Sequence, residues 1–115
     1  MSRTRVKFCG IVDARDARDA AALGVDAIGL VFYPRSPRAL DPARAAGIRR
    51  ALPSYVAAVG LFVDAPPDAV RRIAGAVGLD ALQFHGSESP DECEASTPAG
   101  VRWWGAVRMR AEVDL

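Results

Sequence analysis

Short apolar runs of strand type alternate with segments of helical length along the whole sequence, and this alternation constrains the fold more than any other feature. The strand-type runs cover residues 5–9, 27–33, 56–63, 81–85 and 102–109. A single helix between two strands returns the chain to the same edge of the sheet, so neighbouring strands must run parallel. We therefore expect an α/β fold of repeated βα units.

Each helical segment opens with a residue that can cap free helical N–H groups, or with proline in the first turn. The expected openings are Asp13, Asp41-Pro42, residues 64–67 and the capping-box sequence at residues 89–92. Gly24 and Gly78 are expected to end the first and third helices in left-handed turns. The junctions at residues 24–28 and 78–82, G-V-D-A-I and G-L-D-A-L, nearly repeat one another, as expected of a repeated unit.

Composition excludes several classes of function. The chain is 50% hydrophobic and 25% charged with a formal net charge of +1, so no strong field favours nucleic acid or a membrane surface. Cys9 and Cys93 belong to no C-x-x-C pair, which argues against a zinc cluster or redox motif and favours a reducing cytoplasm. The N-terminal apolar run is too short for an export signal or a membrane anchor.

The ends of the expected strands carry the chemistry, because ligands bind at the carboxyl edge of parallel α/β folds. Alternation places the polar residues of two strands on one face, namely Lys7, Cys9, Gln83 and His85. The apolar residues between and beside them, Phe8, Leu82 and Phe84, are expected to face the helices. A cationic amine near a thiol favours the reactive thiolate, so Cys9 is the reactive candidate.

Taken singly, these residues have ordinary structural interpretations. Cys9 alone would more often be a small buried hydrophobe, Arg38 a solvated loop charge, and His85 a hydrogen-bonded strand-end histidine. Cys93 is expected to pack inertly on the fourth helix, and Asp64 to cap the third helix rather than act as an acid. Trp103 and Trp104 are adjacent in a strand, so they should point to opposite faces and fill the core and the barrel.

Four motifs together resemble the phosphoribosylanthranilate isomerase family of tryptophan biosynthesis. They are K-F-C-G at residues 7–10, G-L-V-F-Y-P-R-S-P-R at 29–38, V-G-L-F-V at 59–63 and L-Q-F-H-G at 82–86. The resemblance implies a (β/α)₈ TIM barrel, of which residues 1–115 would be about the first half, the N-terminal part of a single domain. The strand pattern alone leaves an open doubly wound sheet equally acceptable.

The resemblance also implies an isomerase acting on a phosphosugar without a cofactor or a metal. In this Amadori rearrangement Cys9 would be the general base and Arg38 would hold the anthranilate carboxylate. His85 would line the same pocket, and we expect Lys7 and Gln83 to bind the substrate too. The family's general acid and phosphate-binding loops belong to later strands, beyond Leu115. Gly105 stands where relatives often carry a basic residue, which puts one pocket contact in doubt.

Three functional alternatives stay open on the sequence: an active isomerase, a half-barrel that keeps the family sequence without turnover, and another phosphosugar barrel enzyme. Residues 1–115 alone are expected to be inactive, because the acid and the phosphate loops are missing from them. They are also expected to self-associate, because open barrel edges would expose inward-facing residues such as Val31, Val63 and Val107.

Overall fold

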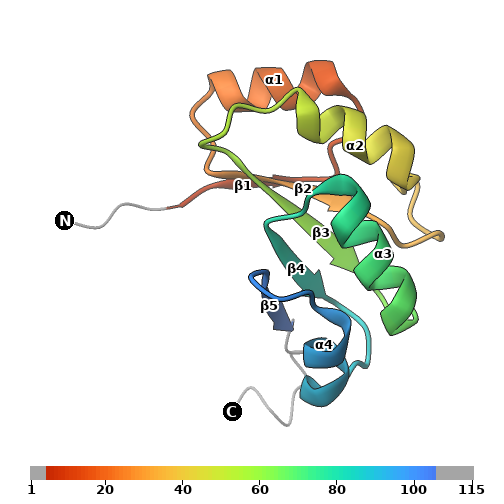
Figure 1. The fold of residues 1–115 in the computed structure, drawn as a ribbon. Coiled ribbons are helices and arrows are strands. Elements are labelled where there is room, and N and C mark those ends of the chain that lie inside the picture. The colour runs from red at the N-terminus through yellow and green to blue at the C-terminus, as the bar shows by residue number, and fades with distance from the viewer. Residues whose placement is uncertain (1–4, 106–115) are drawn as a thin grey trace, which may run out of the picture.

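The chain forms a parallel sheet covered on one face by helices (Figure 1). The computed structural model describes residues 5–105. The strands in this part are β1 (Lys7–Cys9), β2 (Ala27–Val31), β3 (Ala57–Phe62), β4 (Ala81–Phe84) and β5 (Arg102–Gly105). The helices between them are α1 (Ala14–Ala22), α2 (Pro42–Arg50), α3 (Pro67–Val77) and α4 (Pro90–Ser96). Chain order and spatial order coincide, β1-β2-β3-β4-β5, and all four pairings are parallel, which confirms the expected βα repeat.

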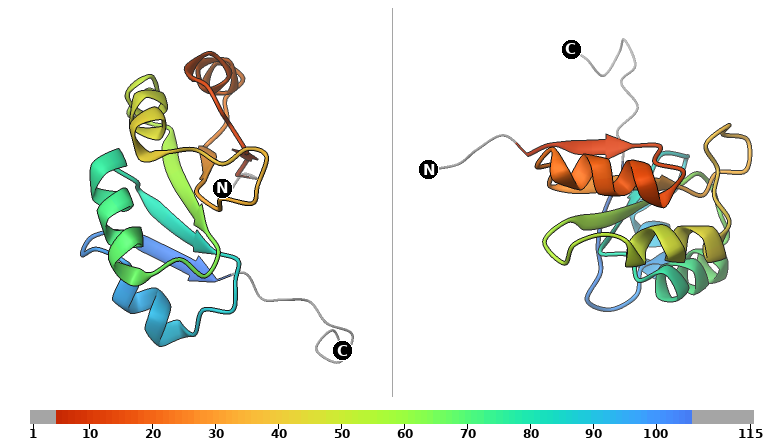
Figure 2. Two further views of the ribbon diagram at one scale, coloured as in Figure 1. Left: turned by 90° about the vertical axis from the view of Figure 1, so that its right-hand side faces the viewer. Right: turned by 90° about the horizontal axis from the view of Figure 1, so that it is seen from above.

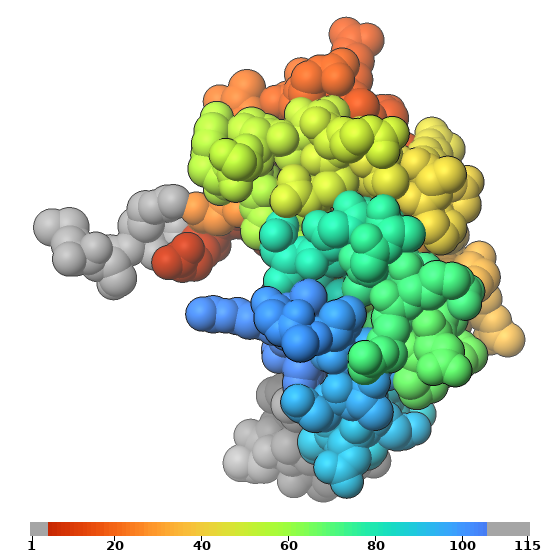
Figure 3. All heavy atoms as spheres, viewed as in Figure 1, coloured from red at the N-terminus to blue at the C-terminus, as the bar shows by residue number. Residues whose placement is uncertain are grey.

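The helices lie in an arc along the outer face of a curved sheet, so the inner face is concave (Figure 2). Figure 3 shows the covered side, where successive units follow one another from α1 to α4. A sheet that curls with its helices outside is half of the arrangement found in a (β/α)₈ barrel. The structure thus favours the barrel over the open doubly wound sheet.

The core lies between the helices and the outer face of the sheet. Every second residue of the central strands is buried there, including Ile28, Leu30, Ala58, Phe62 and Leu82. A row of rings continues this layer, since Phe62 stacks 5.2 Å from Phe32 and lies 6.3 Å from Phe84, which in turn meets Trp103 edge-on at 6.2 Å. Burying each large side chain contributes about 1.5–3 kcal/mol, so this layer supplies much of the stability.

The helix boundaries follow the capping signals. The carboxylates of Asp13 and Asp41 accept hydrogen bonds from the backbone N–H groups of the third residue in their helices. Ser89 and Glu92 form a reciprocal capping box at the start of α4. Gly78 ends α3 with a left-handed φ of 81°. These expectations are confirmed.

The two nearly identical junctions, at residues 24–28 and 78–82, form the same pair of hydrogen bonds. The carboxylate of Asp26 accepts a hydrogen bond from the backbone N–H of Val6 at 2.7 Å, and that of Asp80 accepts one from the N–H of Ala58 at 2.8 Å. In return, the backbone N–H of Asp26 donates to the carbonyl of Val6, and that of Asp80 donates to the carbonyl of Ala58. Each aspartate therefore ties the start of its own strand to the preceding strand.

Asp64 does not cap the third helix, and that expectation is wrong. The residue before α3 is Pro66, which makes no side-chain capping bond. Asp64 has a left-handed φ of 51°, and its carboxylate accepts hydrogen bonds from the backbone N–H and the hydroxyl of Ser87. Two prolines start α3 without a cap, which leaves the carboxylate free to fasten the loop after β4.

Two expectations of exposure and burial are also wrong. Phe8 is 41% exposed and lies outside the core, because β1 is the edge strand of the described sheet and pairs there with β2 alone. Val31 is buried although it faces inward, because Leu40 donates to its carbonyl and the returning segment at Ala39 bridges to it. Val63 is half-buried, and Val107 lies outside the described residues.

Several strands are shorter than predicted. The first loses residues 5 and 6, and the second and third end at Val31 and Phe62. At the end of β2 the carbonyl of Val31 accepts from the backbone N–H of Leu40 in the loop that follows. The fifth strand is described only as far as Gly105, and the rest of its expected length lies outside the described residues.

Candidate active site

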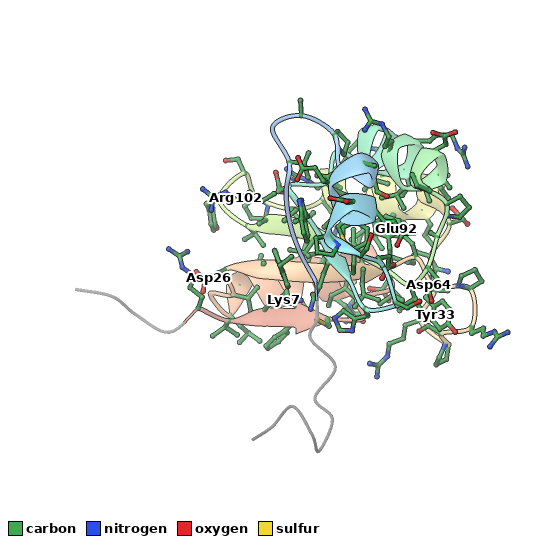
Figure 4. The ribbon with its side chains drawn as sticks, turned by 90° about the horizontal axis from the view of Figure 1, so that it is seen from below. Lys7, Asp26, Tyr33, Asp64, Glu92 and Arg102 are labelled. Atoms are coloured by element: carbon green, nitrogen blue, oxygen red, sulfur yellow. The ribbon has the colours of Figure 1, made fainter. Side chains whose placement is uncertain are left out.

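The carboxyl ends of the strands gather on one edge of the sheet. Figure 4 shows Asp26 and Arg102 at the amino end of the sheet and Tyr33 and Asp64 at the opposite end, with Lys7 between them. Cys9 is the last residue of β1 and its side chain is exposed. Cys9 therefore lies at a carboxyl strand end, where parallel α/β folds bind their ligands, whereas Lys7 lies further into the sheet.

Cys9 is held against a glycine of the next strand. Cys9 and Gly29 are register partners in β1 and β2. A β-carbon added at Gly29 would come within 3.0 Å of the Cys9 sulfur. The absence of a side chain at residue 29 therefore makes room for the thiol.

Arg38 reaches the same strand end from the loop after β2. Its Cδ, Nη1 and Nε atoms would lie 2.6, 3.0 and 3.3 Å from a β-carbon at Gly10, so its side chain lies across the residue that follows Cys9. Gly10 also has a left-handed φ of 78°. Within residues 5–105 the guanidinium forms no hydrogen bond or ion pair, so its fork of donors remains available to a carboxylate.

Lys7, Gln83 and His85 form a hydrogen-bonded row across the inner face. The Lys7 ammonium donates to Gln83 Oε1 at 2.5 Å, although the two residues are 76 positions apart in sequence. The other end of the same amide, Gln83 Nε2, lies 2.6 Å from His85 Nε2. Curvature of the sheet brings β1 and β4 together in this way without direct strand pairing.

Trp104 takes part in this face, a contact that the sequence did not indicate. The Lys7 ammonium lies over the Trp104 ring at 5.7 Å from its centroid, within range of a cation–π interaction. Trp103 packs against the core on the other face, so the expected opposite orientation of the two tryptophans is confirmed. Trp104 also lines a hollow of about 520 Å³ at the amino end of the inner face, with Lys7, Val59 and Arg102 among the other lining residues.

Asp64, Ser87 and Glu88 connect the loops after β3 and β4. Besides the two bonds from Ser87 to Asp64, Glu88 accepts from the backbone N–H of Asp64 at 2.6 Å and from that of Gly86 at 2.8 Å. A β-carbon on Gly86 would collide with the Asp64 carboxylate at 2.4 Å. The network fixes the loop that follows His85, and its sequence signal is the glycine directly after the histidine.

Cys93 is a packing residue, as expected. Its side chain is 2% exposed within the core. Burial raises the pKa of the Cys93 thiol, and the nearby carboxylates of Glu88 and Glu92 raise it further. The protonated thiol is a poor nucleophile, which leaves Cys9 as the accessible sulfur.

Residues 5–105 contain neither a cluster of metal-binding side chains nor a helix that could span a membrane. No group of three or more His, Cys, Asp or Glu side chains is arranged to hold a metal ion in residues 5–105. Among the helices of the same range, none has the length and apolarity needed to cross a membrane.

The structure brings the five residues predicted from the sequence together in two groups, Cys9 with Arg38 and Lys7 with Gln83 and His85. Arg38 lies beside the end of the strand that carries Cys9, and the other three form the hydrogen-bonded row. The site residues that the sequence prediction missed are mainly Gly10, Gly29 and Gly86. Each of them lies within one of the four sequence motifs, and this position is the signal that could have identified it.

Known proteins match the chain along its whole length. The family described as N-(5'-phosphoribosyl)anthranilate (PRA) isomerase matches residues 6–115. The isomerase of that name from Nitrosococcus oceani is 52% identical over 98% of this chain, and the one from Pseudomonas aeruginosa is 55% identical over all of it. Both alignments cover 53% of the relative, so the chain spans about half the length of the curated relatives it matches.

Solved structures agree with this relationship. A phosphoribosyl anthranilate isomerase in complex with reduced 1-(o-carboxyphenylamino)-1-deoxyribulose 5-phosphate superposes with a TM-score of 0.91 at 38% identity, over 97% of this chain and 57% of that one. The Thermus thermophilus isomerase superposes with a TM-score of 0.86 at 39% identity, over 92% of this chain and 52% of that one. Strand order, strand-end residues and these matches agree, and the chain belongs to the phosphoribosylanthranilate isomerase family.

Proposed function

We propose that residues 1–115 are the N-terminal part of a single barrel domain that converts N-(5-phosphoribosyl)anthranilate to 1-(2-carboxyphenylamino)-1-deoxyribulose 5-phosphate. The observation that carries the proposal is the closeness of Cys9, which is exposed, to a guanidinium that has no partner among residues 5–105, since the Arg38 side chain lies across Gly10. A related protein has been crystallised with the reduced form of this product, which supports the choice of substrate.

The reaction needs two proton transfers and no external oxidant or reductant. An acid protonates the ribose ring oxygen, the bond from that oxygen to C1 breaks, and the nitrogen lone pair forms a C1=N bond. A base then removes the proton from C2, the C–H electrons form C1=C2, and the C=N electrons return to nitrogen. The enol then loses its O–H proton while C1 gains a proton, which leaves a ketone at C2, so C2 is oxidised and C1 is reduced within one molecule.

Cys9 is the proposed base, since the residue is exposed and the missing side chain of Gly29 leaves room for its sulfur. Arg38 is proposed to hold the anthranilate carboxylate, because a guanidinium fits a planar carboxylate bidentately. His85, Gln83 and Lys7 are proposed to contribute to substrate binding. The acid and the phosphate site belong to the half of the barrel that the family carries after these residues. A reducing cytoplasm suits a mechanism that needs the free thiol of Cys9.

The test is a chimera that joins residues 1–115 to the C-terminal half of the Nitrosococcus oceani relative. We expect it to convert the substrate and to restore growth without tryptophan to a strain that lacks this isomerase. Cys9→Ala in the chimera should abolish turnover with little change in unfolding free energy, and Cys9→Ser should recover little, because a hydroxyl is a much poorer base than a thiolate. A folded chimera without turnover, or one as active with Cys9→Ala, would refute the proposal.

A further inference from the structure

We infer that Lys7 and Gln83 fix the tautomer of His85, holding the ring neutral with its proton on Nδ1, and so make Nδ1–H a hydrogen-bond donor to an oxygen acceptor of a sugar phosphate. Lys7 and Gln83 are then positioning residues that act through His85. The tautomer rests on hydrogen bonds alone, and only its use in the reaction rests on the proposed function.

The first step concerns the orientation of the Gln83 amide. Lysine carries three donors and no acceptor, so the atom that faces the Lys7 ammonium at 2.5 Å must be the amide oxygen. The ammonium is itself held in place, because it lies over the Trp104 ring. The oxygen and nitrogen of Gln83 therefore cannot exchange places without putting donor against donor.

The second step concerns the hydrogen bond between the Gln83 amide and the His85 ring. With its oxygen on Lys7, Gln83 presents its NH₂ group to His85 Nε2 at 2.6 Å. An amide nitrogen only donates, so Nε2 has to accept through its lone pair. An imidazolium, or the tautomer with the proton on Nε2, would oppose two N–H groups at this short distance. The neutral ring with Nδ1–H is the form that fits.

The third step concerns the other ring nitrogen. His85 is exposed at the end of β4, and its backbone N–H already donates to Phe62, which fixes the start of the loop. Within the described part of the chain Nδ1 has no hydrogen-bond partner. Its proton is therefore available to an acceptor that enters at the carboxyl edge, and a sugar phosphate presents hydroxyl and ring oxygens of that kind.

Nitrogen NMR of the imidazole tests the inference directly, because His85 is the one histidine in the sequence. Chain 1–115 is labelled with ¹⁵N-histidine and recorded at about pH 8, above the ordinary pKa of histidine. The same spectrum is recorded on the chimera, where His85→Gln identifies the resonance. We expect the unprotonated nitrogen to couple strongly to both ring carbon-bound protons, which identifies it as Nε2. An unprotonated Nδ1, which is the form that predominates for histidine in water, would overturn the inference.

Two variants separate positioning from a general structural effect. Gln83→Glu replaces the donor that faces Nε2 with an acceptor, so the proton is expected to move to Nε2, whereas Lys7→Met frees the amide to rotate and should give a mixture of tautomers. Lys7→Arg keeps a donor facing Gln83 and should leave the spectrum unchanged. Wild-type coupling patterns in both Gln83→Glu and Lys7→Met would show that neither residue sets the tautomer.

A kinetic cycle then tests whether the tautomer serves the proposed reaction. In the chimera we expect Gln83→Glu to lower kcat/KM about tenfold, the effect of about 1.4 kcal/mol. In a His85→Gln background the same change should alter kcat/KM less than twofold, because the residue through which Gln83 acts is gone. Equal losses in both backgrounds would overturn the positioning role. An inactive chimera with the expected spectrum would refute the proposed function and leave the tautomer established.

Discussion

The sulfur of Cys9 lies beside the place that a side chain on Gly29 of the neighbouring strand would occupy. A β-carbon at residue 29 would come to 3.0 Å from the sulfur and 3.1 Å from the α-carbon of Cys9. The backbone cannot yield easily here, because the two residues are paired in register between β1 and β2. The position of the thiol therefore depends on the missing side chain at residue 29.

The first prediction is that Gly29→Ala displaces the thiol. In the chimera we expect turnover to fall at least tenfold and the free energy of unfolding to fall by about 1–3 kcal/mol, as in an overpacked core. Steady-state kinetics and urea unfolding measure the two effects. Gly75→Ala is the matched control, since nothing lies within 4 Å of the added carbon on the exposed side of α3. It should raise stability by about 0.5–1 kcal/mol and leave turnover unchanged.

The second prediction concerns Arg38. Arg38→Lys in the chimera should raise KM about tenfold with a smaller effect on kcat, because an ammonium cannot make the paired contact to a planar carboxylate. An analogue without the carboxylate should bind the variant and the parent almost equally. Arg35→Lys changes the same residue type three positions earlier in the same loop and should change KM less than twofold. An equal loss of affinity for both ligands would assign Arg38 a structural role instead.

The third prediction uses the raised pKa of Cys93. A thiol reagent at pH 8 should modify Cys9 in the folded protein and Cys93 only after unfolding, because burial raises the Cys93 pKa above its ordinary value of about 9.0. The folded state keeps this proton more tightly than the unfolded state. Its contribution to stability is therefore fully present below pH 9 and is lost as the pH rises through the folded pKa. Cys93→Ala should remove this fall in the free energy of unfolding above pH 9. The same fall with pH in Cys93→Ala and in the parent would show that Cys93 does not cause it.

The fourth prediction concerns Asp64. Asp64→Ala should lower the free energy of unfolding by about 2 kcal/mol, because it removes the two bonds from Ser87 and leaves a β-carbon in the left-handed region. Asp64→Asn should cost less than about 1 kcal/mol, since asparagine tolerates this conformation and keeps an acceptor. Asp19→Ala, on the exposed side of α1, is the control and should stay within about 0.5 kcal/mol. Equal effects of Ala and Asn at residue 64 would disprove the argument.

Features set by neighbouring residues were predictable from the sequence. The caps at Asp13, Asp41 and Ser89 follow from residues within three positions of one another, and the strand alternation needs only a local period of two. The match of the two junctions at Asp26 and Asp80 also predicted a repeated unit correctly. Local chemistry therefore determines most of the element order.

Features that depend on distant residues were not predictable. Asp64 looks like a helix cap in the sequence, but its partner is 23 positions away at Ser87. The bond from Lys7 to Gln83 spans 76 positions and exists because the sheet curls. The shared inner face of these residues could be predicted from alternation, whereas their contact required the curvature.

The last prediction concerns residues 1–115 on their own, which we expect to self-associate and to have no measurable isomerase activity. In the described sheet β1 and β5 each pair on one side only, so both strands present unpaired backbone groups. Phe8 in β1 and Trp104 in β5 are both 41% exposed, and the amino end of the inner face holds a hollow whose lining includes Ala27, Val59 and Ala81. Association of two copies would cover these surfaces, so sedimentation should give a mass above that of a monomer, and Phe8→Lys should shift the distribution towards monomer.

Isomerase activity of residues 1–115 should be absent in the monomer and in the associated state, because Cys9 can act as a base only on a substrate whose ring oxygen is protonated, and the proposed acid comes from the other half of the barrel. Adding that half from the Nitrosococcus oceani relative as a separate chain should restore turnover in proportion to complex formation, whereas a monomer of residues 1–115 that converts substrate unaided would contradict the prediction.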